Sequence, residues 1–102
     1  MRFQRLDKLI NIEDGYRRRF KIDSLDVVLA REGDDVTAFS AVCPHQEQPL
    51  EDGCIENGVI YCPRHNYGFD LRTGQHIEQQ CASLTIYTVH YEGNDVGILM
   101  AY

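Results

Sequence analysis

Two short segments of this chain repeat each other, and they constrain its fold more than any other feature. Cys43, Pro44 and His45 are consecutive, and Cys62 and His65 repeat the step with one more residue before the histidine. Thiolate and imidazole groups are common ligands of borderline and transition metals. Each cysteine is followed by a proline, which fixes φ and removes a backbone donor, and so stiffens the loop. The pair of steps predicts one metal site built from two loops.

Other interpretations of the four side chains remain open from the residues alone. A lone cysteine is usually a small buried apolar residue, and a lone histidine is often an ordinary surface or core residue. Classical zinc fingers place both cysteines before both histidines, whereas the order here is Cys, His, Cys, His. Because interleaving does not forbid zinc, a zinc site and unrelated side chains remain alternatives to a redox metal.

Strand signals surround both steps, while helical periodicity is hard to find. Short apolar or β-branched runs predict strands in the segments 16–22, 26–32, 36–42, 55–62, 68–77 and 84–100, the last as a hairpin. Turn signals lie between two of these segments at 32–35, and within segments at Asn57-Gly58, at Thr73-Gly74 and near Gly93-Asn94. Short strands with frequent turns favour an all-β fold, an antiparallel sandwich or a small barrel. Each Cys-His step follows a strand, so each is expected at a loop tip.

Length and charge limit the classes of protein to consider. A chain of 102 residues is predicted to form one domain, 1–102. The net charge of −6 argues against nucleic acid as a partner. No apolar run approaches the ~20 residues of a membrane helix, so no membrane partner is expected. Residues 1–15 mix charges with apolar residues, which is unlike a secretory signal, and the expected location is cytoplasmic.

Several further residues carry weaker signals. Cys54 and Cys81 have no histidine neighbour and are predicted to be unligated thiols, and His76 and His90 are predicted to lie at the surface. The basic run 16–19 is predicted to be the solvent face of a strand rather than a binding patch. The acidic residues near the first step, Glu47, Glu51 and Asp52, are candidates for contact with a basic partner.

The Cys43-x-His45 step, the Cys62-x-x-His65 step and the following "GFDLRTG" resemble the Rieske iron–sulfur motif. In a Rieske centre, two histidines replace two cysteines on one iron of a [2Fe–2S] cluster. The resemblance implies one such cluster per chain, with Cys43 and Cys62 on the inner iron and His45 and His65 on the outer iron. It also implies a Rieske-like antiparallel β-sandwich or small barrels, with a two-loop cluster-binding subdomain at roughly residues 40–75.

The resemblance further implies an electron-transfer protein rather than an enzyme. Rieske oxygenases carry a second domain with mononuclear iron, for which 102 residues leave no room. The chain therefore resembles the small Rieske ferredoxins, which pass single electrons from a flavoprotein ferredoxin reductase to a terminal oxygenase and are monomers when free. Asn66 after the second histidine is also similar to the small Rieske-like subunit of NAD(P)H nitrite reductases. That subunit, bound to a nitrite reductase large subunit, is the alternative, and a non-redox metal module or redox sensor is a third.

Departures from the high-potential Rieske proteins imply a low potential. In those proteins an extra cysteine in each loop forms a disulfide, and the matching positions here are Gln48 and Arg64. They also direct a serine and a tyrosine hydroxyl at the cluster, and the matching positions are Tyr67 and Phe69, of which Phe69 has no hydroxyl. Fewer hydrogen bonds to the sulfurs lower the potential, so a value near the low end of the Rieske range, roughly −150 mV, is expected.

Overall fold

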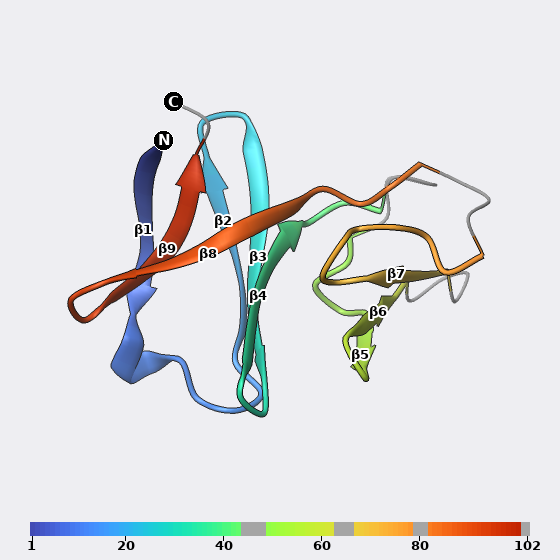
Figure 1. Cartoon of the computed structure of the whole chain (residues 1–102), viewed down its shortest axis with the longest axis horizontal. Helices are drawn as coiled ribbons and strands as arrows, with labels where there is room; N and C mark the ends of the chain where they lie inside the picture. Colours follow the sequence, from blue (N-terminus) through green and yellow to red (C-terminus); the bar gives the residue numbers. More distant parts are fainter. Residues whose placement is uncertain (44–48, 63–66, 79–81, 101–102) are drawn as a thin grey trace.

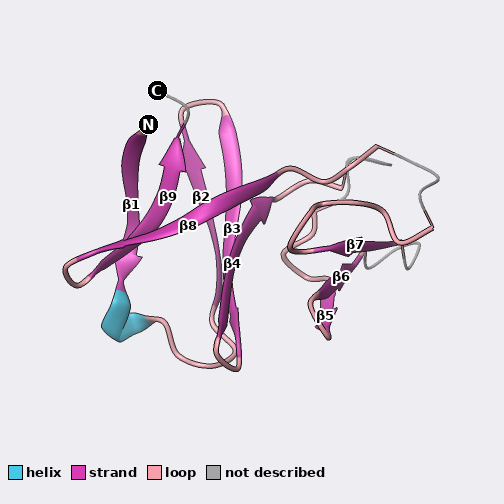
Figure 2. Cartoon of the chain, viewed as in Figure 1, coloured by secondary structure: helices cyan, strands magenta, loops and turns pink. Residues whose placement is uncertain are grey.

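The computed structural model describes residues 1–43, 49–62, 67–78 and 82–100. Within these ranges the chain is almost entirely β-structure (Figure 2), with one short 3-10 helix. The elements are β1 (Arg2–Lys8), η1 (Leu9–Asn11), β2 (Arg17–Ile22), β3 (Leu25–Glu32), β4 (Asp35–Ser40), β5 (Cys54–Glu56), β6 (Val59–Tyr61), β7 (Gly68–Asp70), β8 (Ile86–Glu92) and β9 (Asp95–Met100). Among the described residues, no helix has the length and apolar character needed to cross a membrane.

The strands form two antiparallel sheets that lie side by side (Figure 1). The large sheet has the order β1-β9-β8-β4-β3-β2, and the small sheet has the order β5-β6-β7. The chain leaves the large sheet after β4, builds the small sheet, and returns as β8. The all-β antiparallel fold predicted from the turn and strand signals is confirmed.

Strand β3 is buried on both faces and so belongs to two apolar cores. Val27 and Leu29 point to one core and Val28 and Ala30 to the other, and each is at most 1% exposed. Side chains alternate between the faces of a strand, so a strand covered on both sides needs a continuous apolar run. The run 27–30 supplies it.

The two cores are named after the sheets that they support. The large-sheet core consists of Ile12, Ile22, Val27, Leu29, Ala38, Val96 and Ile98. The small-sheet core consists of Val28, Ala30, Phe39, Ala41, Cys43, Leu50, Ile60, Cys62, Phe69, Leu71 and Leu84. The small-sheet core therefore uses side chains of both sheets and includes two of the predicted metal ligands.

The predicted turns lie between the expected strands. Asn57 and Gly58 have φ values of 53° and 77° and join β5 to β6, as a type I′ hairpin requires. Gly33, with φ of 62°, joins β3 to β4, and Gly93, with φ of 61°, joins β8 to β9. In the segment 68–77, which was predicted with a turn at Thr73-Gly74, β7 ends at Asp70, a turn spans 71–73, and His76 pairs back with Phe69.

Strand β1 was not among the predicted strands. It pairs with β9 at one edge of the large sheet, from Arg2 opposite Met100 to Lys8 opposite Asp95. An edge strand has one open side, where charged residues are tolerated and discourage further pairing. The mixed charge of residues 2–8 therefore suits an edge strand. The same charges interrupt the apolar alternation by which a strand is predicted from sequence.

Candidate metal centre

The first Cys-His step follows β4, where the chain narrows to a neck. Val42 pairs with Pro49 as an isolated antiparallel bridge, and the Leu50 amide donates to the Ala41 carbonyl oxygen at 2.8 Å. Cys43 lies just inside this neck and is 1% exposed. The neck therefore fixes both ends of the first predicted ligand loop. Its other predicted ligand, His45, falls outside the described residues.

The second step is framed in the same way by β6 and β7. Ile60 pairs with Phe69 across these strands, and the Cys62 amide donates to the Tyr67 carbonyl oxygen at 2.8 Å. Cys62 is 1% exposed. The second predicted ligand loop thus begins and ends on two paired strands. Its histidine, His65, also falls outside the described residues.

The fold brings Cys43 and Cys62 into the same apolar core. Leu50, Ile60 and Phe69 of that core are fully buried, so the two thiols lie where water is excluded. Sulfur ligands in such a setting suit iron–sulfur centres, whose potential depends on solvent exposure and on hydrogen bonds to sulfur. The described part of the donor set therefore fits an iron–sulfur cluster.

The prediction that His76 lies at the surface is wrong. It is 3% exposed, and its ring centroid lies 5.0 Å from that of Tyr67 and 5.4 Å from that of Phe69. The cause is the turn after β7: Gly74, with φ of 82°, turns the chain so that residue 76 pairs with Phe69. A side chain at position 74 would collide with the Leu84 carbonyl oxygen, so this turn requires glycine. The Thr73-Gly74 signal was the clue to this burial.

The remaining residues singled out from the sequence lie in varied settings. His90 is half-buried on β8, and Cys54 is exposed at the first position of β5. Cys81 falls outside the described residues. Glu51 is already paired with Arg19, with 3.0 Å between Nη1 and Oε1, whereas Asp52 is exposed. Asp52 is therefore better placed than Glu51 to meet a basic partner.

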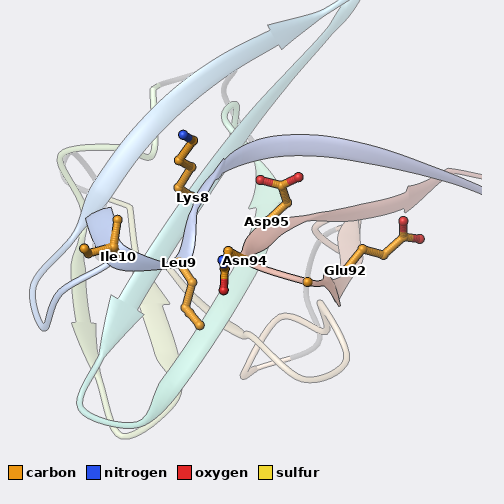
Figure 3. A pocket seen from close by; sticks show the side chains of 7 residues that line it. Lys8, Leu9, Ile10, Glu92, Asn94 and Asp95 are labelled. Carbon is orange, nitrogen blue, oxygen red and sulfur yellow. The ribbon is translucent and has the colours of Figure 1, made fainter.

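A shallow pocket lies between η1 and the β8–β9 turn (Figure 3), and these elements lie on the side of the large sheet away from the small sheet (Figure 1). The Leu9 amide donates to the Asn94 carbonyl oxygen at 2.8 Å, and this hydrogen bond joins η1 to the β8–β9 turn. The residues that line it are Lys8, Leu9, Ile10, Glu92, Gly93, Asn94 and Asp95. Its lining includes no sulfur and no imidazole, so the chemistry expected of this chain belongs to the two-loop end.

The all-β fold, with Cys43 and Cys62 buried in one core, is that of a small β-protein whose described donors suit a metal centre. Residues 3–88 match the model of the Rieske [2Fe-2S] domain, and the chain belongs to this family. It is 30% identical over 84 residues to the ferredoxin component of an alkene monooxygenase system of Xanthobacter autotrophicus, covering 81% of this chain and 69% of that protein.

Solved structures give the same family. The ferredoxin of carbazole 1,9a-dioxygenase from Nocardioides aromaticivorans IC177 is 30% identical, with a TM-score of 0.82 over 94% of this chain and 95% of that chain. A complex of reduced oxygenase and oxidized ferredoxin in carbazole 1,9a-dioxygenase contains a chain that is 23% identical, with a TM-score of 0.81 over 94% of this chain and 100% of that chain. The second likeness is one of fold.

These relatives confirm three predictions: the Rieske-type fold, the [2Fe–2S] cofactor, and an electron carrier of the ferredoxin class rather than a catalytic enzyme. Nitrite reductase small subunits share the fold, with TM-scores of 0.81 and 0.82, but at 22% and 16% identity. The nitrite reductase alternative is therefore not better supported than the ferredoxin.

Proposed function

We propose that this protein is a low-potential one-electron carrier that takes electrons from a flavoprotein reductase and passes them to a terminal oxygenase. The observation that carries the proposal is the burial of Cys43 and Cys62 together at the necks of two loops. Cys43 and Cys62 would hold one iron of the cluster, and His45 and His65 would hold the other. The cluster, when bound, supplies a reversible one-electron couple.

The chain's own part in this function is to hold the ligands in one geometry. The Leu50 and Cys62 amides close the two necks through backbone hydrogen bonds of 2.8 Å each. Phe69 and Leu50 are fully buried and keep water from the sulfur side of the site. A scaffold that fixes the ligands in both redox states keeps the reorganisation on electron transfer small.

The low potential follows from the residues beside the second loop. Phe69 is fully buried and has no hydroxyl, so its side chain offers no hydrogen bond to the cluster. A midpoint potential of roughly −150 mV is expected from direct electrochemistry. A potential well above zero would contradict the low-potential part of the proposal.

The partners belong to this proposal as well. A structurally similar ferredoxin is known in a complex with an oxygenase, which supports a terminal oxygenase as the electron acceptor. Docking is proposed at the two-loop end, where Pro49 is exposed and Tyr67 half-buried. We place the cluster-binding subdomain at roughly residues 40–75 of a single domain, and the protein in the cytoplasm as a monomer when free.

Iron and acid-labile sulfide analysis tests the cluster directly. About two irons and two sulfides per chain are expected, with the EPR spectrum of a reduced [2Fe–2S] centre that has mixed sulfur and nitrogen ligands. Zinc without sulfide would overturn the electron-carrier function.

A second experiment separates the carrier from a reductase subunit. The purified protein is expected to accept electrons from a separable NAD(P)H-dependent flavoprotein reductase and to turn over many times. Stable co-purification with a large reductase chain, without such turnover, would favour the nitrite reductase subunit instead.

A further inference from the structure

Arg17 of strand β2 reaches from the large sheet to the turn that follows the first ligand loop. Its Nη1 donates to the Glu51 carbonyl oxygen at 3.1 Å and also to the Gly53 carbonyl oxygen. Its Nη2 lies 3.4 Å from Glu32 Oε1, and the side chain is 22% exposed. The prediction of a solvent face for the basic run therefore holds for Arg18, at 65% exposed, but not for Arg17.

Along the chain, the turn that Arg17 holds lies between the two predicted ligand loops. The Gly53 amide donates to the Leu50 carbonyl oxygen at 2.9 Å, and the Leu50 amide closes the first neck. On its other side, Gly53 packs so closely on β6 that a side chain there would collide with the Tyr61 carbonyl oxygen. Tyr61 directly precedes Cys62. The 51–53 turn therefore contacts Leu50, which closes the neck beside Cys43, and Tyr61, which precedes Cys62.

The chemistry of arginine suits this place. A planar guanidinium has several donors in fixed directions, so one side chain can hold two carbonyl oxygens and a carboxylate at once. Bonds from a charged donor are stronger than bonds between neutral groups, and partial burial protects them from water. Arg19 adds to the hold through the Glu51 side chain, at 3.0 Å.

We propose that Arg17 is a positioning residue for the iron–sulfur centre, because it fixes the 51–53 turn and so the placement of Cys43 relative to Cys62. The proposal rests on the proposed function, since it concerns the ligands of the cluster. It assigns to the first arginine of the basic run a role that neither Arg18 nor the family pattern of cysteines and histidines supplies.

The test compares Arg17→Gln and Arg17→Lys with Arg18→Gln as the matched control. Arg18 is the next residue of the same strand. Its Nη1 lies 3.7 Å from Asp7 Oδ2, so its ion pair is with β1 and not with the 51–53 turn. Each holo protein is assayed for iron loss to a chelator, for the EPR spectrum of the reduced cluster, and for deuterium uptake by peptides that cover 49–56.

Arg17→Gln is expected to lose iron on the order of ten-fold faster than wild type and to exchange faster over 49–56, because two charged hydrogen bonds are lost. Arg17→Lys keeps the charge but not the fork, so an intermediate rate is expected. Both variants are expected to shift the EPR g values, whereas Arg18→Gln matches wild type in all three assays.

Each other outcome has a separate meaning. A wild-type protein without iron and sulfide would overturn the proposed function itself. A loaded wild type with Arg17 variants that match Arg18→Gln would overturn the positioning role alone. A lower melting temperature with unchanged g values and unchanged iron loss would show that Arg17 only stabilises the fold, which also contradicts the proposal. If Arg17→Gln does not fold, the same criteria apply to Arg17→Lys.

Discussion

The two sheets of this protein differ in how far they can support themselves. Strands of the large sheet have six to eight residues, whereas each strand of the small sheet has three. In the part of the chain that the structure describes, the large-sheet core contains no side chain from the small sheet. The small-sheet core, in contrast, includes Val28, Ala30 and Phe39 of the large-sheet strands β3 and β4. Small sheets need packing partners or a metal to be stable. The large sheet is therefore expected to be the scaffold, and the small sheet to be the part that needs the cluster for stability.

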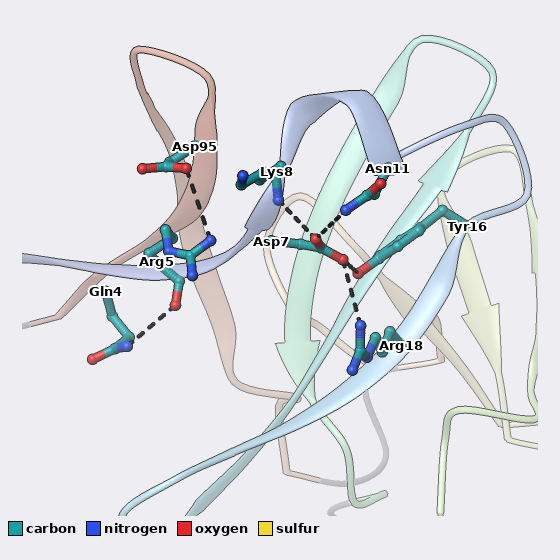
Figure 4. A network of polar contacts seen from close by, with 8 residues as sticks. All are labelled: Gln4, Arg5, Asp7, Lys8, Asn11, Tyr16, Arg18 and Asp95. Atoms are coloured by element: carbon teal, nitrogen blue, oxygen red, sulfur yellow. Dashed lines mark hydrogen bonds and ion pairs between the residues drawn. The ribbon is translucent and has the colours of Figure 1, made fainter.

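The edges of the two regions are also held differently. In the large sheet, the Asp7 carboxylate accepts hydrogen bonds from Asn11 Nδ2 at 2.8 Å, from the Tyr16 hydroxyl at 2.7 Å and from the Lys8 amide at 2.7 Å (Figure 4). This network, which we call the Asp7 network, joins β1 to the segment before β2 without any metal. Around the small sheet, the corresponding closures are the backbone bonds at the two necks, one after β4 and one between β6 and β7, next to the cysteines.

The substitution with the largest expected effect on this contrast is Cys62→Ser. Because a serine hydroxyl is a far poorer ligand for iron than a thiolate, nearly all iron is expected to be lost. Deuterium uptake is then expected to rise over 54–61 and 68–70, while the strands around Val28 and Ile98 stay protected. Cys54→Ser, which changes an exposed thiol, is expected to keep its iron. Equal uptake in both sheets of the Cys62 variant would contradict the division into scaffold and dependent region.

Sequence patterns predicted the features that depend on near neighbours. The 27–30 run and the Asn57-Gly58 turn signal predicted β3 and the β5–β6 hairpin. The two Cys-His steps predicted one metal site; Cys43 and Cys62 lie buried in one core, and the four-ligand set stays a prediction. Features made by distant partners were missed. Strand β1 forms by pairing with β9, from residue 2 opposite residue 100 to residue 8 opposite residue 95. The sequence of residues 2–8 alone does not indicate this distant partner.

The polar contacts of the site show the same limit. Arg17 and Glu51 are distant in sequence, and their contact follows only once β2 and the 51–53 turn are placed together. The sequence predicts a surface position for His76, whereas the Gly74 turn pairs it with Phe69 and buries it. Local signals give strands, turns and ligand motifs, whereas burial of polar side chains depends on tertiary contacts.

A large-to-small substitution in each core sharpens the comparison. Phe39→Ala and Leu29→Ala remove fully buried side chains, so losses of about 3–5 and 2–5 kcal/mol of stability are expected. Only Phe39 belongs to the core that contains Cys43 and Cys62. The melting temperature is therefore expected to fall in both variants. Iron loss to a chelator is expected to accelerate strongly in Phe39→Ala alone. Matched rates of iron loss would show that the two cores are not separate.

The Asp7 network predicts an acid dependence that belongs to the large sheet. Hydrogen bonds from Asn11 and then from Tyr16 lower the pKa of Asp7 from 3.8 to about 2. A lowered carboxyl pKa stabilises the fold above the unfolded value of 3.8, and this contribution is lost as the pH falls through about 2. Asp7→Asn is expected to cost about 1–2 kcal/mol at pH 7.

The difference between wild type and Asp7→Asn is expected to shrink between pH 4 and pH 2, as the wild-type carboxylate takes up its proton. Melting temperatures of both proteins across this range measure it, and the acid lability of the cluster acts on both alike. Arg18→Gln removes an exposed ion pair and a cation–π contact with the Phe20 ring, 5.3 Å from its centroid, and is expected to change stability by less than about 1 kcal/mol. A constant gap between wild type and Asp7→Asn down to pH 2 would rule out the carboxylate as its source.

The smallest expected effect compares two turns, one in each sheet. Gly58 and Gly33 have φ values of 77° and 62°, and a Cβ added at either would meet nothing within 4 Å. Gly→Ala at each position therefore costs about 1 kcal/mol from backbone strain alone. Since Gly33 lies in the scaffold, its variant is expected to lower the melting temperature of the whole protein. The Gly58 variant is expected to raise deuterium uptake mainly over 54–61, because the small sheet opens locally before the large one. Identical behaviour of the two variants would mean that the sheets unfold as one unit, with the cluster joining them rather than supporting only the smaller.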